Sequence, residues 1–257
     1  MNSISKNTEQ VIIGGLLGDS CVTKNDKYNS CLMIVHGPKH LDYLKFKYNF
    51  FFEDGLTTKR GIYTKIQHNK KTNKDYLAYG FFTKSMEVFS EYRTEFYIKN
   101  KKTITREILN KLEPLGLAVW FMDDGNRNIR WHTKKNGLNT IHSRSLVMNI
   151  QGFSFEEAEI IKEYFSGKWL VNVKVYKQRN KPILYINAEN SNKFINIIEP
   201  HIIPSLQYKI DLMYNVTHPL TESDRQIRMS LGQSDANSII VLRYSLIYIE
   251  ICRWRQK

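Results

Sequence analysis

The chain has 257 residues, of which 42% are hydrophobic, and a formal net charge of +13 at pH 7. A chain of this length and composition can bury a sizeable core, in one domain or in two fused halves. The positive charge favours a polyanionic partner, because every phosphate that a lysine or arginine neutralises releases condensed counterions. We therefore expect a protein that binds nucleic acid.

The sequence offers no targeting or membrane segment. The first ten residues contain no apolar stretch and no arginine, which argues against a secretory signal or a transit peptide. No apolar run is long enough to span a bilayer. The three cysteines lack metal-ligand spacing and indicate reduced thiols. The chain is rich in Ile, Lys, Asn and Tyr, whose codons are AT-rich, which indicates an organellar or otherwise AT-rich genome. Of these we expect an organellar gene and a mitochondrial location.

The elements predicted for the first part of the chain extend from a helix that begins at residue 9 to a helix that ends at residue 96. Proline is favoured in the first turn of a helix, so Gly37-Pro38 indicates where the second helix begins. The predicted elements are a helix at 9–19, a hairpin turning near 24–27, a strand at 30–35, a helix at 39–52, strands at 62–67 and 76–83, and a helix at 85–96.

The second half repeats this plan. Ser154-Phe155-Glu156-Glu157 is a capping box, in which the serine hydroxyl and the last glutamate satisfy free backbone N–H groups at the start of a helix. The predicted elements are a helix at 115–124, strands at 129–134 and 145–151 around a loop at 135–142, a helix from 154 to about 165, strands at 171–177 and 183–188, and a helix at 192–198.

The order α-β-β-α-β-β-α therefore occurs twice, which predicts an α+β fold of two pseudo-symmetric halves. We expect the first half at 9–104, the second at 113–215, and a tail of unknown role at 221–257. Because no low-complexity linker occurs between residues 99 and 114, the halves should pack tightly.

Small residues mark the first helix of each half. Glycine in a helix interior costs about 0.5–1 kcal/mol relative to alanine, so several in one helix need a reason. Without a Cβ, another helix can approach more closely than usual. We predict that the two helices pack side by side at a pseudo-twofold axis, through Gly14, Gly15, Gly18, Gly116 and Ala118.

Both helices end in an aspartate, Asp19 in the first and Asp124 in the second. A carboxylate at a helix C-terminus opposes the helix dipole, which makes it a poor structural choice. Two adjacent carboxylates repel, and one takes up a proton unless a cation intervenes. Such oxygen ligands suit Mg²⁺, with the backbone of Gly18 and Asp123 as further candidates, and favour metal-assisted phosphodiester hydrolysis.

The two motifs, IIGGLLGDS at 12–20 and LAVWFMDDG at 117–125, resemble those of LAGLIDADG homing endonucleases in their single-chain form. The first motif departs at Ser20, which replaces the terminal glycine, and the second at Asp123, where a small residue is usual. Register with Asp19 favours Asp124 over Asp123 as the active acid. The resemblance covers residues 9–215 and implies an intron-encoded enzyme that cuts both strands of a long, asymmetric DNA site. The matching positions are Gly14, Asp19, Leu117, Ala118, Asp124 and Gly125.

The resemblance also implies a basic residue after the last helix of each half. Lys102 and Lys209 fit that place, and their separation is close to that of Asp19 and Asp124. Lys101 is the alternative to Lys102. A lysine there could orient the attacking water or neutralise the scissile phosphate.

Several predicted strands alternate an apolar face with a face of Arg, Lys, Gln, Asn, His and Tyr. Such side chains can contact phosphates and base edges, and a β-ribbon fits the major groove. Two such sheets would form a saddle over DNA. The candidate DNA-binding residues are Tyr63, Lys65, Gln67, Arg130, His132, Lys134, Lys174, Tyr176, Gln178, Tyr185 and Asn187.

Three functions compete. The first is a Mg²⁺-dependent, site-specific endonuclease that acts on double-stranded DNA as a monomer. The second is an RNA maturase that binds its host intron with the same fold. The third is an inactive DNA-binding module, which the presence of both carboxylates disfavours, because anions near a DNA backbone weaken binding.

Overall fold

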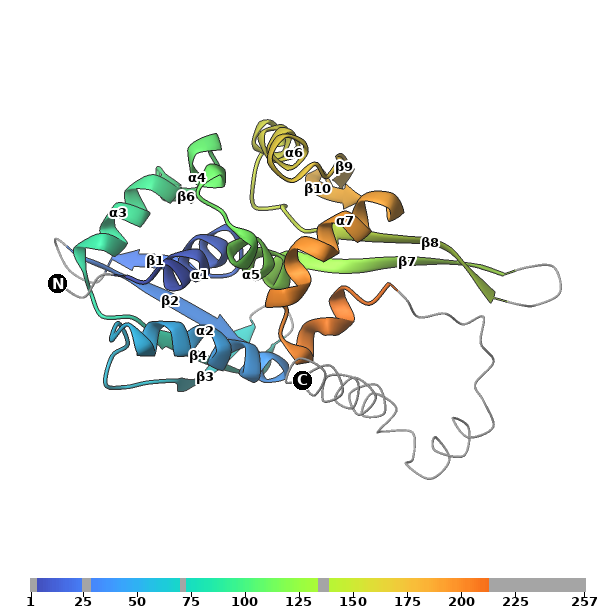
Figure 1. The fold of residues 1–257 in the computed structure, drawn as a ribbon. Coiled ribbons are helices and arrows are strands. Elements are labelled where there is room, and N and C mark those ends of the chain that lie inside the picture. Colours follow the sequence, from blue (N-terminus) through green and yellow to red (C-terminus); the bar gives the residue numbers. More distant parts are fainter. Residues whose placement is uncertain (1–3, 25–28, 70–72, 134–138, 213–257) are drawn as a thin grey trace, which may run out of the picture. The chain divides into compact units, whose positions relative to one another are not determined.

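The computed structural model describes residues 4–24, 29–69, 73–133 and 139–212 (Figure 1). Its elements are α1 (Lys6–Leu17), β1 (Cys21–Lys24), β2 (Ser30–His36), a 3₁₀ turn (Pro38–His40), α2 (Leu41–Glu53), β3 (Tyr63–Asn69), β4 (Lys74–Phe82), α3 (Glu87–Phe96), β5 (Tyr97–Ile98), β6 (Lys101–Lys102), α4 (Arg106–Asn110), α5 (Pro114–Asp124), β7 (Gly125–Thr133), β8 (Asn139–Met148), α6 (Phe155–Trp169), β9 (Val173–Gln178), β10 (Lys181–Ile186), α7 (Ala188–Ile198) and two 3₁₀ turns (Glu199–His201, Pro204–Lys209).

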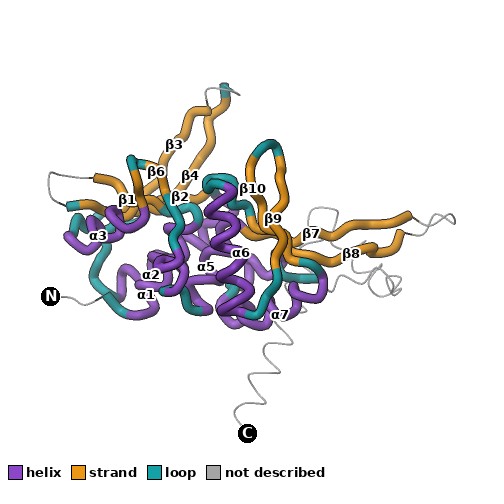
Figure 2. Tube along the Cα trace, turned by 90° about the horizontal axis from the view of Figure 1, so that it is seen from above, coloured by secondary structure: helices purple, strands orange, loops and turns teal. Residues whose placement is uncertain are grey.

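The predicted α+β fold with two αββαββα halves is confirmed. The two four-stranded sheets have the same strand order, β1-β2-β4-β3 in the first half and β7-β8-β10-β9 in the second. The strand pairs β1–β2, β2–β4, β3–β4, β8–β10 and β9–β10 are all antiparallel. Helices α2 and α3 pack on the first sheet and α6 on the second, and the helices gather on one side of the strands (Figure 2).

The described residues up to Arg130 and from Ser143 to Leu212 form one compact unit, which contains the two central helices and both acidic helix ends. The described residues 131–133 of β7 and 139–142 of β8 belong to a separate unit. Among the described residues, no helix is long and apolar enough to cross a membrane.

Helices α1 and α5 lie side by side at the centre of this unit (Figure 1). A Cβ on Gly14 would collide with the carbonyl group of Gly116, so the two backbones touch there. Nearby, the buried Gln10 of α1 donates to the carbonyl oxygen of Lys111 at 2.9 Å and accepts from the N–H of Glu113 at 2.7 Å. Glu113 is the N-cap of α5, so the first helix fixes where the second begins.

Two of the strand boundaries differ from the prediction for a physical reason that the sequence explains. Strand β8 begins at Asn139, whereas the sequence predicted a loop over 135–142. Asn139–His142 are mostly polar, so they lack the apolar alternation that reveals a half-buried strand. Strand β10 ends at Ile186, before the predicted 188, because Asn187 caps α7 by accepting from the N–H of Asn190.

The predicted capping box at Ser154 is present, and its glutamate has a second role. The Glu157 carboxylate accepts from the N–H of Ser154 at 2.7 Å, and also from the hydroxyl of Thr103 and the N–H of Ile104 at 2.8 and 2.9 Å. It thereby ties the second half to the residues that directly follow Lys102.

We expect Glu157→Ala to lower the free energy of unfolding by about 2 kcal/mol, because it removes a cap and leaves a buried N–H unsatisfied. Urea denaturation measures this loss. The matched control is Glu163→Ala, an exposed position on the same helix, which should change little. Equal effects of the two variants would contradict the bridging role.

Candidate active site

The two predicted acids lie at the ends of the central helices. Asp124 is the last residue of α5, and Asp19 follows Gly18, the C-cap of α1. Burial and the nearby carboxylates of Asp19 and Asp123 raise the pKa of Asp124 to about 7. Partial burial and Asp123 also raise the pKa of Asp19. The ends of α1 and α5 thus form one crowded anionic cluster.

Lys102 and Lys209 each lie on one helix end. The Nζ atom of Lys102 donates to the carbonyl oxygen of Gly18 at 2.7 Å. Lys209 donates to the carbonyl oxygen of Met122 at 2.5 Å, and its Nζ atom also lies 3.5 Å from the carbonyl oxygen of Asp123. Burial lowers the pKa of both lysines, and the aspartates oppose that shift. Lys101 is exposed, so of the two candidates Lys102 is the one that lies at the helix end.

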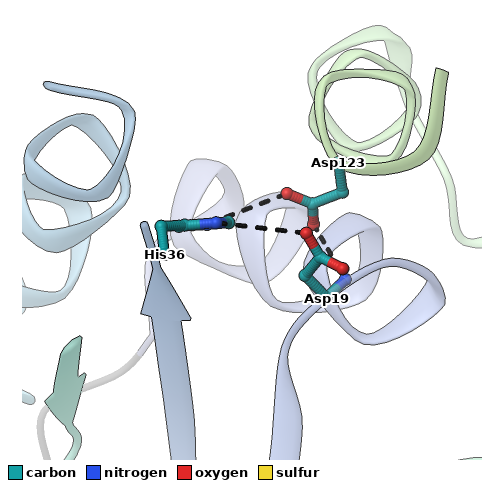
Figure 3. Close-up of side chains that lie close together, drawn as sticks. All are labelled: Asp19, His36 and Asp123. Atoms are coloured by element: carbon teal, nitrogen blue, oxygen red, sulfur yellow. Dashed lines mark hydrogen bonds and ion pairs between the residues drawn. The ribbon is translucent and has the colours of Figure 1, made fainter. Parts of the chain in front are cut away.

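Asp123, the residue that departs from the resemblance, is fully buried and paired. Lys47 of α2, also fully buried, donates to both of its carboxylate oxygens, at 2.7 and 2.9 Å. The N–H of Asp19 donates to Oδ2 of Asp123 at 3.1 Å (Figure 3). A Cβ on residue 18 would collide with the Asp123 side chain, so Gly18 permits this contact.

His36, at the end of β2, faces both Asp19 and Asp123 (Figure 3). Its Nδ1 is 4.0 Å from Oδ2 of Asp19, its Nε2 is 3.9 Å from Oδ1 of Asp123, and its Nε2 is 3.4 Å from Nζ of Lys47. Burial and the Lys47 ammonium lower the pKa of His36 to about 4. The imidazole is therefore neutral at pH 7.

The donor set fits a hard divalent cation. Asp19, His36 and Asp123 offer ligand atoms within 4.8 Å of one another. Lys47 already holds both oxygens of Asp123, however, which leaves the carboxylates of Asp19 and Asp124 as the available donors. Because both have a raised pKa, a cation between them would relieve their repulsion, and carboxylates suit Mg²⁺.

Asp124 makes stability depend on pH in the cation-free protein. The folded state keeps its proton to about pH 7, whereas an ordinary aspartate loses it near 3.8. The folded state therefore binds more protons between these values, so this contribution to stability is lost as pH rises from about 4 to 7. Asparagine cannot ionise. With a chelator present, we expect Asp124→Asn to melt on the order of 5 °C above wild type at about pH 8, with little difference at about pH 4.

Thermal melts of the two proteins across this pH range measure the difference. A difference that does not change with pH, or a variant that melts lower at about pH 8, would contradict the assigned environment of Asp124.

Among the candidate DNA-binding residues, Lys174, Tyr176 and Gln178 of β9 and Tyr185 of β10 share one face of the second sheet. Lys174 is directly opposite Tyr185 in the β9–β10 register, and the rings of Tyr176 and Tyr185 are 5.4 Å apart. Leu184 and Ile186 are buried on the other face. Gln178, at the exposed end of β9, accepts from Gln151 at 3.1 Å.

In the first sheet, Tyr63 stacks on Phe82 and Lys65 is exposed. Ile66, on the face of β3 opposite Tyr63 and Lys65, is 69% exposed. The outer part of the β3–β4 pair extends beyond the helices (Figure 2), so apolar alternation there does not report burial.

The remaining candidates divide into two groups. The strand assignment of Asn187 is wrong, because its side chain caps α7. The Gln67, Arg130 and His132 side chains, and Lys134 as a whole, lie outside the described residues.

Sequence reasoning missed Lys47, His36 and the side chain of Asp123. One signal for Lys47 was available. It stands among the buried positions of α2, in register with Tyr43 and Phe51. A lysine on an apolar helix stripe needs a buried partner, and Asp123, the acid at a position where a small residue is usual, is that partner.

Comparison with known proteins gives a consistent result. The sequence profile of the LAGLIDADG DNA endonuclease family matches residues 9–194. A probable intron-encoded endonuclease 1 of Wickerhamomyces canadensis is 30% identical over 216 residues, which are 83% of this chain and 87% of that protein. The cytochrome b mRNA maturase bI2 of Debaryomyces hansenii is 24% identical over 212 residues, 80% of this chain and 74% of the maturase.

Among solved structures, the homing endonuclease I-WcaI bound to its DNA recognition sequence matches with a TM-score of 0.69 and 27% identity. The match covers 81% of this chain and 87% of that structure.

Proposed function

The chain belongs to the LAGLIDADG DNA endonuclease family, and on that premise we propose that it is a site-specific homing endonuclease that hydrolyses both strands of a long, asymmetric DNA site. The observation that carries the proposal is the pair of aspartates at adjacent helix ends, each with a lysine on the same helix end.

The proposed roles follow from these contacts. Asp19 and Asp124, one at each helix end, hold the divalent cations, for which we propose Mg²⁺. When bound, these cations activate water and stabilise negative charge on the reacting oxygens. Lys102 and Lys209 are partly desolvated ammonium groups fixed at the helix ends, where they can orient water and neutralise a phosphate oxygen. Gly18 and Asp123 supply the carbonyl oxygens at these ends, and the lysines already bind or approach them.

The strands supply the DNA contacts in this proposal. Lys174, Tyr176 and Tyr185 form a polar and aromatic face suited to phosphates and base edges, with Tyr63 and Lys65 on the other sheet. The net charge of +13 supports a polyanionic partner. We propose that the protein acts as a monomer, because one chain contains both acidic helices. We also propose that an intron of an organellar genome, specifically a mitochondrial one, encodes it.

Cleavage selection tests this function. Purified protein is incubated with a pooled duplex library in Mg²⁺, beside Asp19→Asn/Asp124→Asn. We expect discrete cuts with short overhangs from the wild type alone. Failure to cut a library that includes intron-insertion junctions would overturn the proposal.

The similarity to a maturase supports a second candidate, splicing assistance to the host intron. The double-aspartate variant separates the two roles, because RNA binding does not require the carboxylates. Splicing that the variant still promotes would establish the maturase role, and splicing that neither protein promotes would exclude it.

A further inference from the structure

The ends of α1 and α5 differ in the residue that precedes the aspartate, although the two halves are pseudo-symmetric. Gly18 precedes Asp19, whereas the buried Asp123 precedes Asp124. The Asp123 side chain leaves its own helix, crosses to the first half and accepts from the backbone N–H of Asp19. Gly18 has no side chain with which to make the reciprocal contact. The first aspartate therefore has a support that comes from the opposite half.

Lys47 and His36 extend this support. The Lys47 ammonium group can only donate, so the His36 Nε2 atom that lies 3.4 Å from it must be the acceptor nitrogen. With Nε2 accepting from Lys47, the ring N–H is on Nδ1, which lies on the Asp19 side, 4.0 Å from Oδ2. His36 consequently presents an N–H to the Asp19 carboxylate or to a water bound on it.

The neighbours of this network are themselves fixed. The hydroxyl of Tyr43 donates to the carbonyl oxygen of Val119 at 3.1 Å, and the Lys47 ammonium lies 4.4 Å from the centre of the Tyr43 ring. Because Asp123, Lys47 and His36 are all buried, their positions are set by packing as well as by charge. Such rigid support is what a reacting carboxylate requires.

We propose that Asp123, Lys47 and His36 are positioning residues for Asp19 alone, so that the two strand-cutting centres of this chain are unequal. This inference rests on the proposed function. It requires that loss of the network slow the cleavage of one DNA strand more than that of the other, whereas general loosening of the helix interface would slow both.

The test uses Asp123→Ala/Lys47→Met, because removing only one partner would leave a buried unpaired charge and destabilise the fold strongly. A thermal melt checks that the double variant is folded. Two selected target duplexes, each already nicked at the cut position of one strand, report each centre separately. Phe51→Leu is the matched control, since Phe51 is buried on the same helix as Lys47 and its loss loosens the same region while the charged network is retained.

We expect the double variant to slow one of the two reactions about tenfold or more relative to the other, as misplacement of a reacting group does. Asp19→Asn should slow the same strand preferentially, and Phe51→Leu should not change the ratio. Equal slowing of both strands, or no slowing, would overturn the inference. If the wild type cuts neither duplex, the proposed function fails instead.

Substitutions of His36 test the same positioning role independently. Asparagine can place an N–H near the position of Nδ1, whereas alanine cannot. We expect His36→Ala to reproduce the strand bias and His36→Asn to restore most of the lost rate. A bias that is equal in both variants would contradict a role for the Nδ1 proton.

Discussion

Replacing Asp19 and Asp124 together with asparagine is expected to lower the rate of duplex cleavage roughly a thousandfold or more, because the bound cations then lose their anionic ligands at both helix ends. The substitution preserves side-chain size and removes only charge. At Asp124 it also removes a carboxylate whose pKa lies near 7, so the variant should fold at least as well as wild type.

Single-turnover rates on the selected target measure this loss, and a gel-shift titration checks that DNA binding is retained. Asp42→Asn is the matched control, since Asp42 is an exposed carboxylate in the first turn of α2, and it should cut at the wild-type rate. A double-aspartate variant that still cleaved at full rate would falsify the assigned mechanism.

Gly14→Ala is expected to lower the melting temperature by about 5–10 °C, because the added Cβ collides with the Gly116 carbonyl and forces α1 and α5 apart. In an ordinary helix the same change would stabilise by about 0.5–1 kcal/mol, so the sign of the effect is diagnostic. Cleavage should fall further than stability, since separation of the helices also separates Asp19 from Asp124.

Differential scanning calorimetry measures the shift. Gly37→Ala is the control, because a Cβ there meets no atom within 4 Å and the backbone is extended. It should leave the melting temperature unchanged within about 1 °C. A Gly14→Ala protein that melted at or above the wild-type temperature would mean that the helices are not in backbone contact.

The sequence predicted those features that repeat. Apolar periodicity and cap residues located both αββαββα halves, since one face of each element must be buried. The capping box at Ser154 was visible because it depends on four consecutive residues. The pairing of Lys102 with Lys209 followed from their matching offset, and each lies on a helix carbonyl as that symmetry implies.

Features that break the symmetry could not be predicted in this way. The Lys47–Asp123 pair joins residues 76 positions apart, and no local pattern encodes such a contact. Asn187 continues the alternating pattern of the preceding strand, so the sequence predicted it as part of that strand, whereas its side chain caps α7. The exposure of Ile66 could not be predicted either, because alternation distinguishes the two faces of a strand and does not show whether the apolar face is covered.

The most direct test of the central claim is end mapping of both strands of the selected duplex after a single turnover. We predict that one chain cuts both strands, a few base pairs apart, in Mg²⁺ and not in chelator, as expected for paired acids at one pair of helix ends. A cut confined to one strand, or cutting that persists in chelator, would contradict cation-dependent cleavage of both strands by Asp19 and Asp124.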